Sequence, residues 1–121
     1  MSEEKKVAVQ AANGEPEVQF SGSYNFQHPL EFEGQAYSEV KYDLTRLRGI
    51  DLVACQAAAN RLRHTGESET MMTDSLLHAV IFARSADLPE QFVLELSAAD
   101  FAAWQVVAQS FLASGLSCVI R

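Results

Sequence analysis

Residues 30–44 read LEFEGQAYSEVKYDL, and this stretch decides the fold that the sequence predicts. Apolar and polar side chains alternate before and after Glu33-Gly34, a pattern typical of strands with one face toward a core. Gly34 can adopt the positive φ that a tight hairpin turn requires. The stretch therefore predicts an antiparallel β-hairpin.

The strands of the hairpin are expected to extend well beyond the turn and to contain one irregularity. Residues 24–26 begin an extended segment, and Pro29 rules out a helix in the residues just before it. Tyr37 falls on the opposite parity from Val40, so a bulge or irregularity is expected near Ser38. The prediction is a small antiparallel sheet, either the hairpin alone or the hairpin with a third short strand.

Helical spacing of apolar residues replaces strand alternation after Leu44. We expect a helix over 45–64 capped by Thr45 and stopped by Gly66, although Gly49 weakens its first turn and could move its start a residue or two past position 49. A second helix is expected over 71–86, followed by a short turn over 89–96 that starts at Pro89. The last helix is expected over 98–113, with a capping box at Ser97 and Asp100 and a stop at Gly115. The predicted fold class is α+β, in which a small N-terminal antiparallel sheet precedes a bundle of three to four helices.

The 121 residues are expected to form one domain preceded by an arm. Residues 1–19 carry many charges and few large apolar groups, which predicts a flexible acidic arm, although residues 7–9 could add a short strand. The rest, 20–121, is expected to fold as a single α+β domain with a hairpin region over 20–44, a helical region over 45–113 and an apolar tail over 114–121.

Composition argues against two classes of partner. Nine Lys and Arg against sixteen Asp and Glu give a formal net charge of −7, whereas a nucleic-acid binder needs a basic surface. No apolar run approaches the ~18 residues that can span a bilayer. We therefore expect neither nucleic acid nor a membrane as a partner.

No pattern typical of a catalytic or metal site occurs in the sequence. Cys55 and Cys118 belong to no close-spaced pair, and the three histidines lie in no metal-ligand spacing. There is no Gly-rich phosphate loop and no Gly-x-Ser-x-Gly elbow. We expect no catalytic residue, no cofactor and no metal, and we interpret the chain as a binding module.

Three features each allow two interpretations. The run 79–83 is apolar on nearly every side, so its helix should lie centrally or face a partner, such as a second copy in a homo-oligomer. Trp104, with aromatic residues at helical spacing, is either core or a ligand-binding cluster. Residues 41–64 carry five basic and two acidic side chains, which either dock an acidic partner or pair with neighbouring carboxylates.

The order of short motifs resembles that of the Mu-like phage tail assembly chaperones. Residues 29–40 match a Pro-apolar-Glu-Phe-x-Gly-x-x-Tyr-x-Glu-apolar stretch, and 46–52 match a basic stretch ending in Gly-x-Asp-Leu. The family's central helix resembles 76–82, its Leu-Pro turn resembles 88–89, and its acidic-aromatic helix start resembles 99–101. The resemblance covers about residues 24–112, whereas the arm and the loop at 65–70 depart from it.

The resemblance implies a non-enzymatic protein that holds the long tape measure protein soluble while tail tube subunits polymerise around it. Such a protein works in the cytoplasm of a bacterial host and is not expected in the mature virion. Its partners would be the tape measure protein and, as a second candidate, the tail tube protein. Two other functions stay open: a structural tail component retained in the particle, and a small ligand-binding or enzyme accessory domain with a pocket near Trp104.

Partner contacts are expected on an apolar set and a basic set of residues. The apolar set lies on predicted helix faces and consists of Leu76, Val80, Phe82, Phe101, Trp104 and Phe111. The basic set, which could contact carboxylates of a partner, consists of Arg46, Arg48, Arg61 and Arg63.

Overall fold

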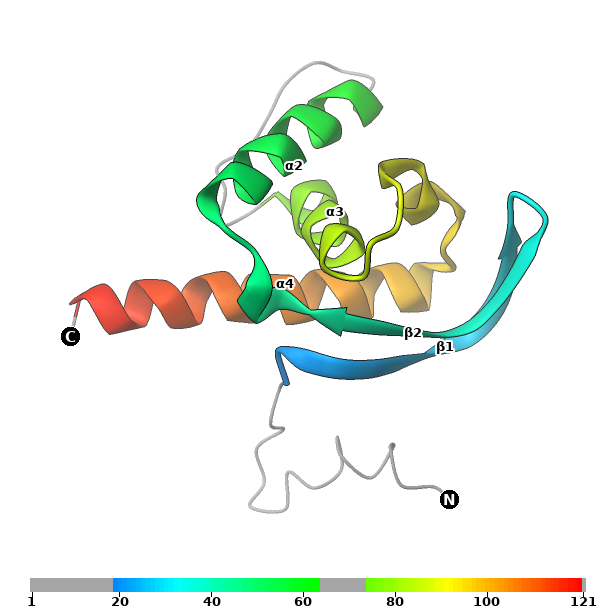
Figure 1. Ribbon diagram of the computed structural model, residues 1–121, viewed down its shortest axis with the longest axis horizontal. Helices are drawn as coiled ribbons and strands as arrows, with labels where there is room; N and C mark the ends of the chain where they lie inside the picture. Colours follow the sequence, from blue (N-terminus) through cyan, green and yellow to red (C-terminus); the bar gives the residue numbers. More distant parts are fainter. Residues whose placement is uncertain (1–18, 64–73, 121) are drawn as a thin grey trace.

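The computed structural model describes residues 19–63 and 74–120, the last six of them as backbone only. A hairpin is followed by helical elements, which confirms the predicted α+β class (Figure 1). Residues 1–18 of the predicted arm, the candidate strand at 7–9 and the predicted stop at Gly66 lie outside this part of the chain. In order, the elements are β1 (Ser21–Phe32), β2 (Gln35–Asp43), the 3-10 turn η2 (Leu44–Arg46), α2 (Gly49–Leu62), α3 (Ser75–Ser85), the 3-10 turn η3 (Glu90–Glu95) and α4 (Ala98–Ile120).

The hairpin has the predicted two-residue turn. Phe32 pairs with Gln35 across it, and the turn residues Glu33 and Gly34 have φ values of 52° and 82°. Two positive φ values let the turn follow the twist of the strands, and glycine adopts one without a steric penalty. In the described residues β1 and β2 form a two-stranded sheet, so the third strand that the sequence left open is absent there.

The two strands lose register midway, at the position that the parity of Tyr37 and Val40 predicts. Asn25 pairs with Glu39 and Leu30 pairs with Tyr37, so residues 26–29 of β1 lie opposite Ser38 alone. The extra residues include a proline, which has no N–H to donate to a ladder. The backbone N–H groups at this irregularity therefore need an acceptor other than β2.

Asp100 of α4 supplies that acceptor. Its carboxylate is fully buried and accepts hydrogen bonds from the amides of Gln27 (2.8 Å) and His28 (3.1 Å) and from the hydroxyls of Tyr24 (2.5 Å) and Ser97 (2.8 Å). The Asp100 amide donates to Ser97 Oγ, as a capping box requires, but the carboxylate holds β1 as well as the helix start. One side chain thus joins α4 to the irregular part of β1.

Helix α2 begins later than the sequence predicts. Thr45 is not its N-cap, because Asp43 Oδ1 accepts the Thr45 amide (3.0 Å) and caps the separate turn η2. Helix α2 starts at Gly49, where Asp51 accepts the amide of Arg48 at 2.8 Å. The Asp43 side chain, two residues before Thr45, therefore accepts the Thr45 amide in the arrangement of an Asx turn.

The two later helices differ from prediction at their ends. Asp74 caps α3 by accepting the amide of Leu77, and η3 starts one residue after Pro89 rather than at it. Helix α4 does not stop at Gly115 but continues to Ile120. A glycine costs a helix about 1 kcal/mol, but it ends one only where the chain turns into a left-handed conformation, and here the backbone stays helical.

Helix α3 lies between α2 and α4 (Figure 1), and it forms the centre of the core. Every residue of the run 79–83 is at most 3% exposed, so the interpretation in which this helix lies centrally is confirmed. On the α4 side, the ring of Phe82 stacks on Trp104 with centroids 4.4 Å apart. Rings of Tyr24, Phe26 and Phe92 also surround Trp104, which packs β1 and η3 against the same centre.

Candidate partner-binding groove

The structure places the predicted apolar set in or around the core. Phe82 and Trp104 are fully buried and reach no surface of the folded chain, whereas Val80, which is 3% exposed, lines a groove between α2, α3 and η3. Leu76, Phe101 and Phe111 are half-buried and pack against the same core. These six residues are brought together mainly as packing, and a partner could touch Phe82 and Trp104 only if the chain opened.

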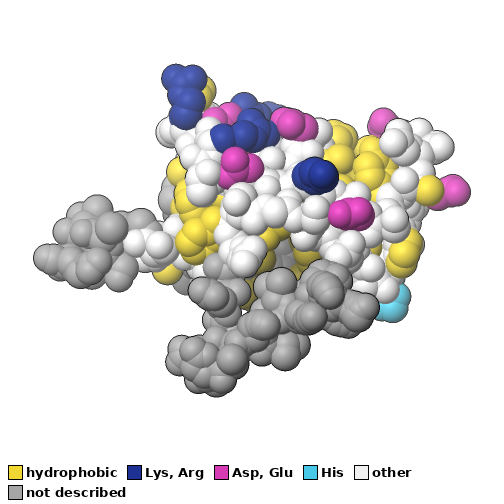
Figure 2. All heavy atoms as spheres, turned by 60° about the horizontal axis from the view of Figure 1, so that its bottom comes forward, with side chains coloured by type: hydrophobic (Ala, Val, Ile, Leu, Met, Phe, Trp, Pro, Cys, Tyr) yellow, Lys and Arg dark blue, Asp and Glu magenta, His cyan; other side chains and the backbone are white. Residues whose placement is uncertain are grey.

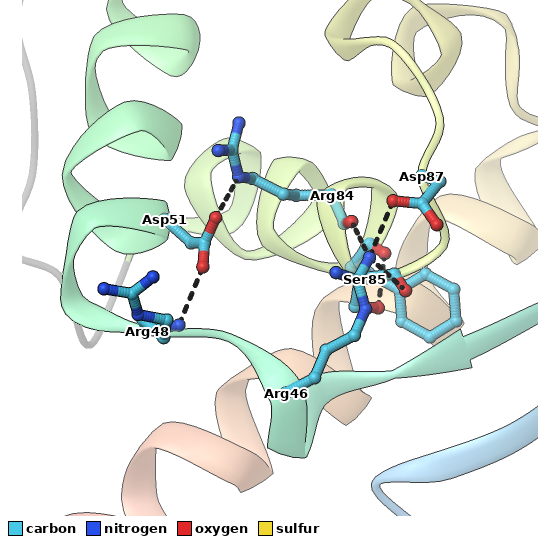
Figure 3. Close-up of polar contacts among 7 residues, drawn as sticks. Arg46, Arg48, Asp51, Arg84, Ser85 and Asp87 are labelled. Carbon is cyan, nitrogen blue, oxygen red and sulfur yellow. Dashed lines mark hydrogen bonds and ion pairs between the residues drawn. The ribbon is translucent and has the colours of Figure 1, made fainter.

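Three arginines of the predicted basic set are paired with carboxylates. Arg46 contacts Asp87 and Arg61 contacts Glu90, each at 2.7 Å, and Arg63 contacts Asp74 at 2.6 Å. Arg46 also donates to the carbonyls of Arg84 and Ser85 at the end of α3, as Figure 3 shows. The interpretation in which the basic residues pair with their neighbours therefore holds for these three. The Arg48 side chain has no ion pair within the described ranges, and in Figure 3 its guanidinium points away from Asp51.

The pair of Arg63 and Asp74 is structural, because it is buried. The two side chains are 13% and 5% exposed and share two N–H···O contacts, at 3.2 and 2.6 Å. Burial by itself would raise the pKa of Asp74, but the hydrogen bonds from Arg63 and from the Leu77 amide outweigh it and lower the pKa. This pair ties the end of α2 to the start of α3.

A groove of about 370 Å³ opens between α2, α3 and η3. Its α2 wall is made of small side chains, which leave room that leucines would fill. The apolar lining consists of Ala54, Cys55, Ala58, Val80, Leu88 and Pro89, and the polar lining consists of Arg61, Arg84, Glu90 and Gln91. Of this group, only Arg61 and Val80 were predicted from the sequence as partner contacts, and nothing in the sequence placed them in one site.

Two ion pairs cross between the elements that form the groove. Arg84 Nε donates to Asp51 Oδ1 at 2.8 Å, which joins α3 to α2. Arg61 donates to both carboxylate oxygens of Glu90, at 2.7 and 3.1 Å, which joins α2 to η3. The Arg61 and Arg84 side chains are 61% and 45% exposed and their partners Glu90 and Asp51 are each 19% exposed, so solvent screens each pair through its arginine and weakens it. Opposite charges also alternate along one edge of the face drawn in Figure 2.

The apolar surface continues from the groove onto the outside of α2. Ile50 and Val53 are 63% and 61% exposed, and with Ala54 and Ala57 they follow the i, i+3, i+4, i+7 spacing of one helix face. Leu94, on η3, is 56% exposed. The sequence analysis missed this face. The sequence feature that could have predicted this face is that α2, like α3, carries apolar residues on nearly every side.

The groove and its surroundings have little reactive character. Burial raises the pKa of the Cys55 thiol to about 11, so the thiol at the groove is protonated at neutral pH and is a poor nucleophile. Across residues 19–63 and 74–120, no three His, Cys, Asp or Glu side chains gather where they could hold a metal ion. None of the helices in these ranges is long and apolar enough to cross a membrane.

An apolar groove with charged side chains at its rim is a surface suited to binding another polypeptide. Such a site is typical of the class of proteins that act by binding other proteins. Residues 23–113 match the family described as phage tail assembly chaperone proteins, E, or 41 or 14. The match spans most of the chain, so the chain belongs to this family, and the resemblance drawn from its short motifs is confirmed. No curated protein and no solved structure matches the chain.

Proposed function

We propose that this chain is a tail assembly chaperone that binds the tape measure protein and keeps it soluble while the tail tube assembles. The observation that carries the proposal is the uncovered apolar surface of α2 and the groove, in a chain whose family serves tail assembly. A long unassembled protein with apolar stripes aggregates unless a complementary apolar surface covers them.

The proposed chaperone releases its client and catalyses nothing. A groove of about 370 Å³ and the neighbouring face of α2 offer a modest contact area, which suits a complex that tail tube subunits must displace. The formal net charge of −7 disfavours aggregation of the complex. We place this activity in the cytoplasm of the bacterial host, and we expect the chain to be absent from the mature virion.

The test is coexpression with the tape measure protein of the same phage, alone, with the wild-type chain, and with two Val→Glu variants. Val53→Glu puts a charge on the exposed apolar face of α2, whereas Val106→Glu makes the same change at an exposed site of α4, outside the groove. Wild type and Val106→Glu should yield soluble tape measure protein in a complex, and Val53→Glu should not.

The proposal fails if the tape measure protein is equally soluble alone and no complex is recovered. Purified mature particles provide a second measurement. A chain that copurifies with them in fixed ratio would favour the structural-component alternative over a released chaperone.

A further inference from the structure

We propose that Asp51 and Glu90 are internal substitutes for carboxylates of the client. In the free chain they occupy Arg84 and Arg61 at the groove, and a client helix whose apolar stripe is flanked by Asp or Glu replaces them. This inference rests on the proposed function, and it names the chemistry of the client segment that the groove accepts.

The position of two arginines at the groove favours a client segment that carries carboxylates. Arg61 and Arg84 both line the groove, so a segment that fills it brings its flanking side chains to these guanidiniums. An arginine stays charged at any physiological pH and presents a planar fork of donors that matches a carboxylate. A segment without carboxylates would strip the arginines of water or displace their partners without replacing the contacts.

The exchange is inexpensive because both arginines face solvent and because Asp51 has a second function. Its Oδ1 accepts from Arg84, whereas its Oδ2 accepts the amide of Arg48 at the start of α2. When Arg84 turns to a client carboxylate, the helix cap therefore stays in place. Glu90 gives both oxygens to Arg61 and makes no other hydrogen bond in the described part of the chain, so it can turn to solvent.

The shape of α2 favours a helix as the occupant. Ile50 and Val53 project from its outer face, and Ala54, Ala57 and Ala58 are small enough for another helix to approach to about 8–10 Å between axes. Arg48 stands at the N-terminal end of this face without a carboxylate partner in residues 19–63 and 74–120. Once Asp51 and Glu90 are displaced, three arginines border the apolar surface, which complements an apolar stripe bordered by carboxylates.

The experiment measures the binding of fluorescent helical peptides to the full chain. Three peptides of about 20 residues, long enough to form a helix in water, share one leucine stripe and differ only in its flanking residues, which are Glu, Gln or Lys. The Glu peptide should bind wild type about tenfold more tightly than the Gln peptide, since each of two exposed ion pairs contributes about threefold. High salt should remove this preference.

Two variants, each of which replaces a carboxylate by its amide, test whether a bound peptide displaces an internal partner from an arginine at the groove. Glu90→Gln removes the internal partner that either peptide must displace from Arg61, so it should tighten the binding of both the Glu and the Gln peptide about threefold. Asp87→Asn frees Arg46, which does not line the groove, and should leave both affinities unchanged. Asn tolerates the positive φ of 61° at position 87, so this control keeps the backbone.

Equal binding of the Glu and Gln peptides, a preference for the Lys peptide, binding of none of them, or the same tightening by Asp87→Asn would each overturn the inference. A wild-type dimer that Val53→Glu dissociates would overturn it as well, because a second copy would then occupy this face. Each of these results is compatible with a successful coexpression experiment, so a failure here is distinguishable from a failure of the proposed function.

Discussion

The two sides of α3 use apolar residues in opposite ways. Toward α4, Phe82 lies in a closed cluster of rings with Trp104, and both side chains are fully buried. Toward α2, Val80 lies beside alanines and a groove, and beyond it Ile50 and Val53 are exposed. The comparison teaches that apolar sequence does not mark a binding surface by itself. The size of the neighbouring side chains decides whether the surface is covered.

Charged residues show the same contrast. Asp100 and the Arg63–Asp74 pair are buried with several hydrogen bonds each, whereas the Arg61–Glu90 and Arg84–Asp51 pairs face solvent beside the groove. Buried pairs are costly to break because they leave an uncompensated charge, whereas exposed pairs exchange partners at little cost. The first kind holds the fold together, and the second kind is available for recognition.

The largest effect should come from Phe82→Glu. This change removes a stacked ring and places a carboxylate at a fully buried site, so we expect a loss of at least about 5 kcal/mol and an unfolded chain. Circular dichroism and urea denaturation measure it. Ile50→Glu, on the exposed side of α2, should change stability by no more than about 0.5 kcal/mol. A cooperatively folded Phe82→Glu variant would show that the two sides of α3 do not differ as described.

Arg63→Met should have the second-largest effect. It leaves the Asp74 carboxylate buried without its partner, which costs about 3–5 kcal/mol. Arg61→Met makes the same change in an exposed pair and should cost no more than about 1 kcal/mol. The two variants are compared by urea denaturation, and equal losses would contradict the division into structural and exchangeable pairs.

Asp100→Asn should cost about 2–3 kcal/mol. The amide keeps the shape of the side chain but offers one acceptor oxygen where the carboxylate accepts from Tyr24, Gln27, His28 and Ser97. Ser97→Ala, which removes only the cap of the helix start, should cost about 1 kcal/mol. A loss for Asp100→Asn that does not exceed the loss for Ser97→Ala would mean that the contacts to β1 contribute nothing.

Acid should destabilise the fold by a smaller amount. Hydrogen bonds lower the pKa of Asp100 and of Asp74 despite their burial, so on acidification the unfolded chain binds protons at these groups before the folded chain does. Stability is therefore complete above the ordinary Asp pKa of about 3.9 and falls as the pH drops from there through the lower folded values. Urea midpoints measured between neutral pH and pH 2.5 test this, and Asp100→Asn should show a weaker dependence than wild type.

Several features of the fold and the site follow from short stretches of sequence. The hairpin rests on the alternation around Glu33-Gly34, and the irregularity opposite Ser38 rests on the parity of Tyr37 and Val40, two residues close together in the sequence. The order of strands and helices rests on the change from a period of two to a helical period. Even the local errors have local causes: Asp43 caps the turn η2, which contains Thr45, and accepts a hydrogen bond from the Thr45 hydroxyl that was expected to cap a helix.

The candidate site depended on contacts between distant residues. Nothing near Arg84 in the chain indicates that it reaches Asp51, or that Arg61 meets Glu90, because each pair joins two different elements. Apart from Ser97, the partners of Asp100 likewise lie in β1, more than 70 positions away. The predicted apolar set contained Val80, but spacing along one helix does not tell which neighbouring helix carries small side chains.

By itself, the sequence determined the α+β class, the hairpin and its irregularity, the succession of helices and, through its ordered motifs, the family. Only the tertiary structure decided which apolar residues are covered, which arginines are fixed and where α2 leaves a groove. The physical reason is one of range. Turn geometry and helical or strand periodicity depend on residues a few positions apart, whereas burial and ion pairing depend on which surfaces meet after the chain has folded.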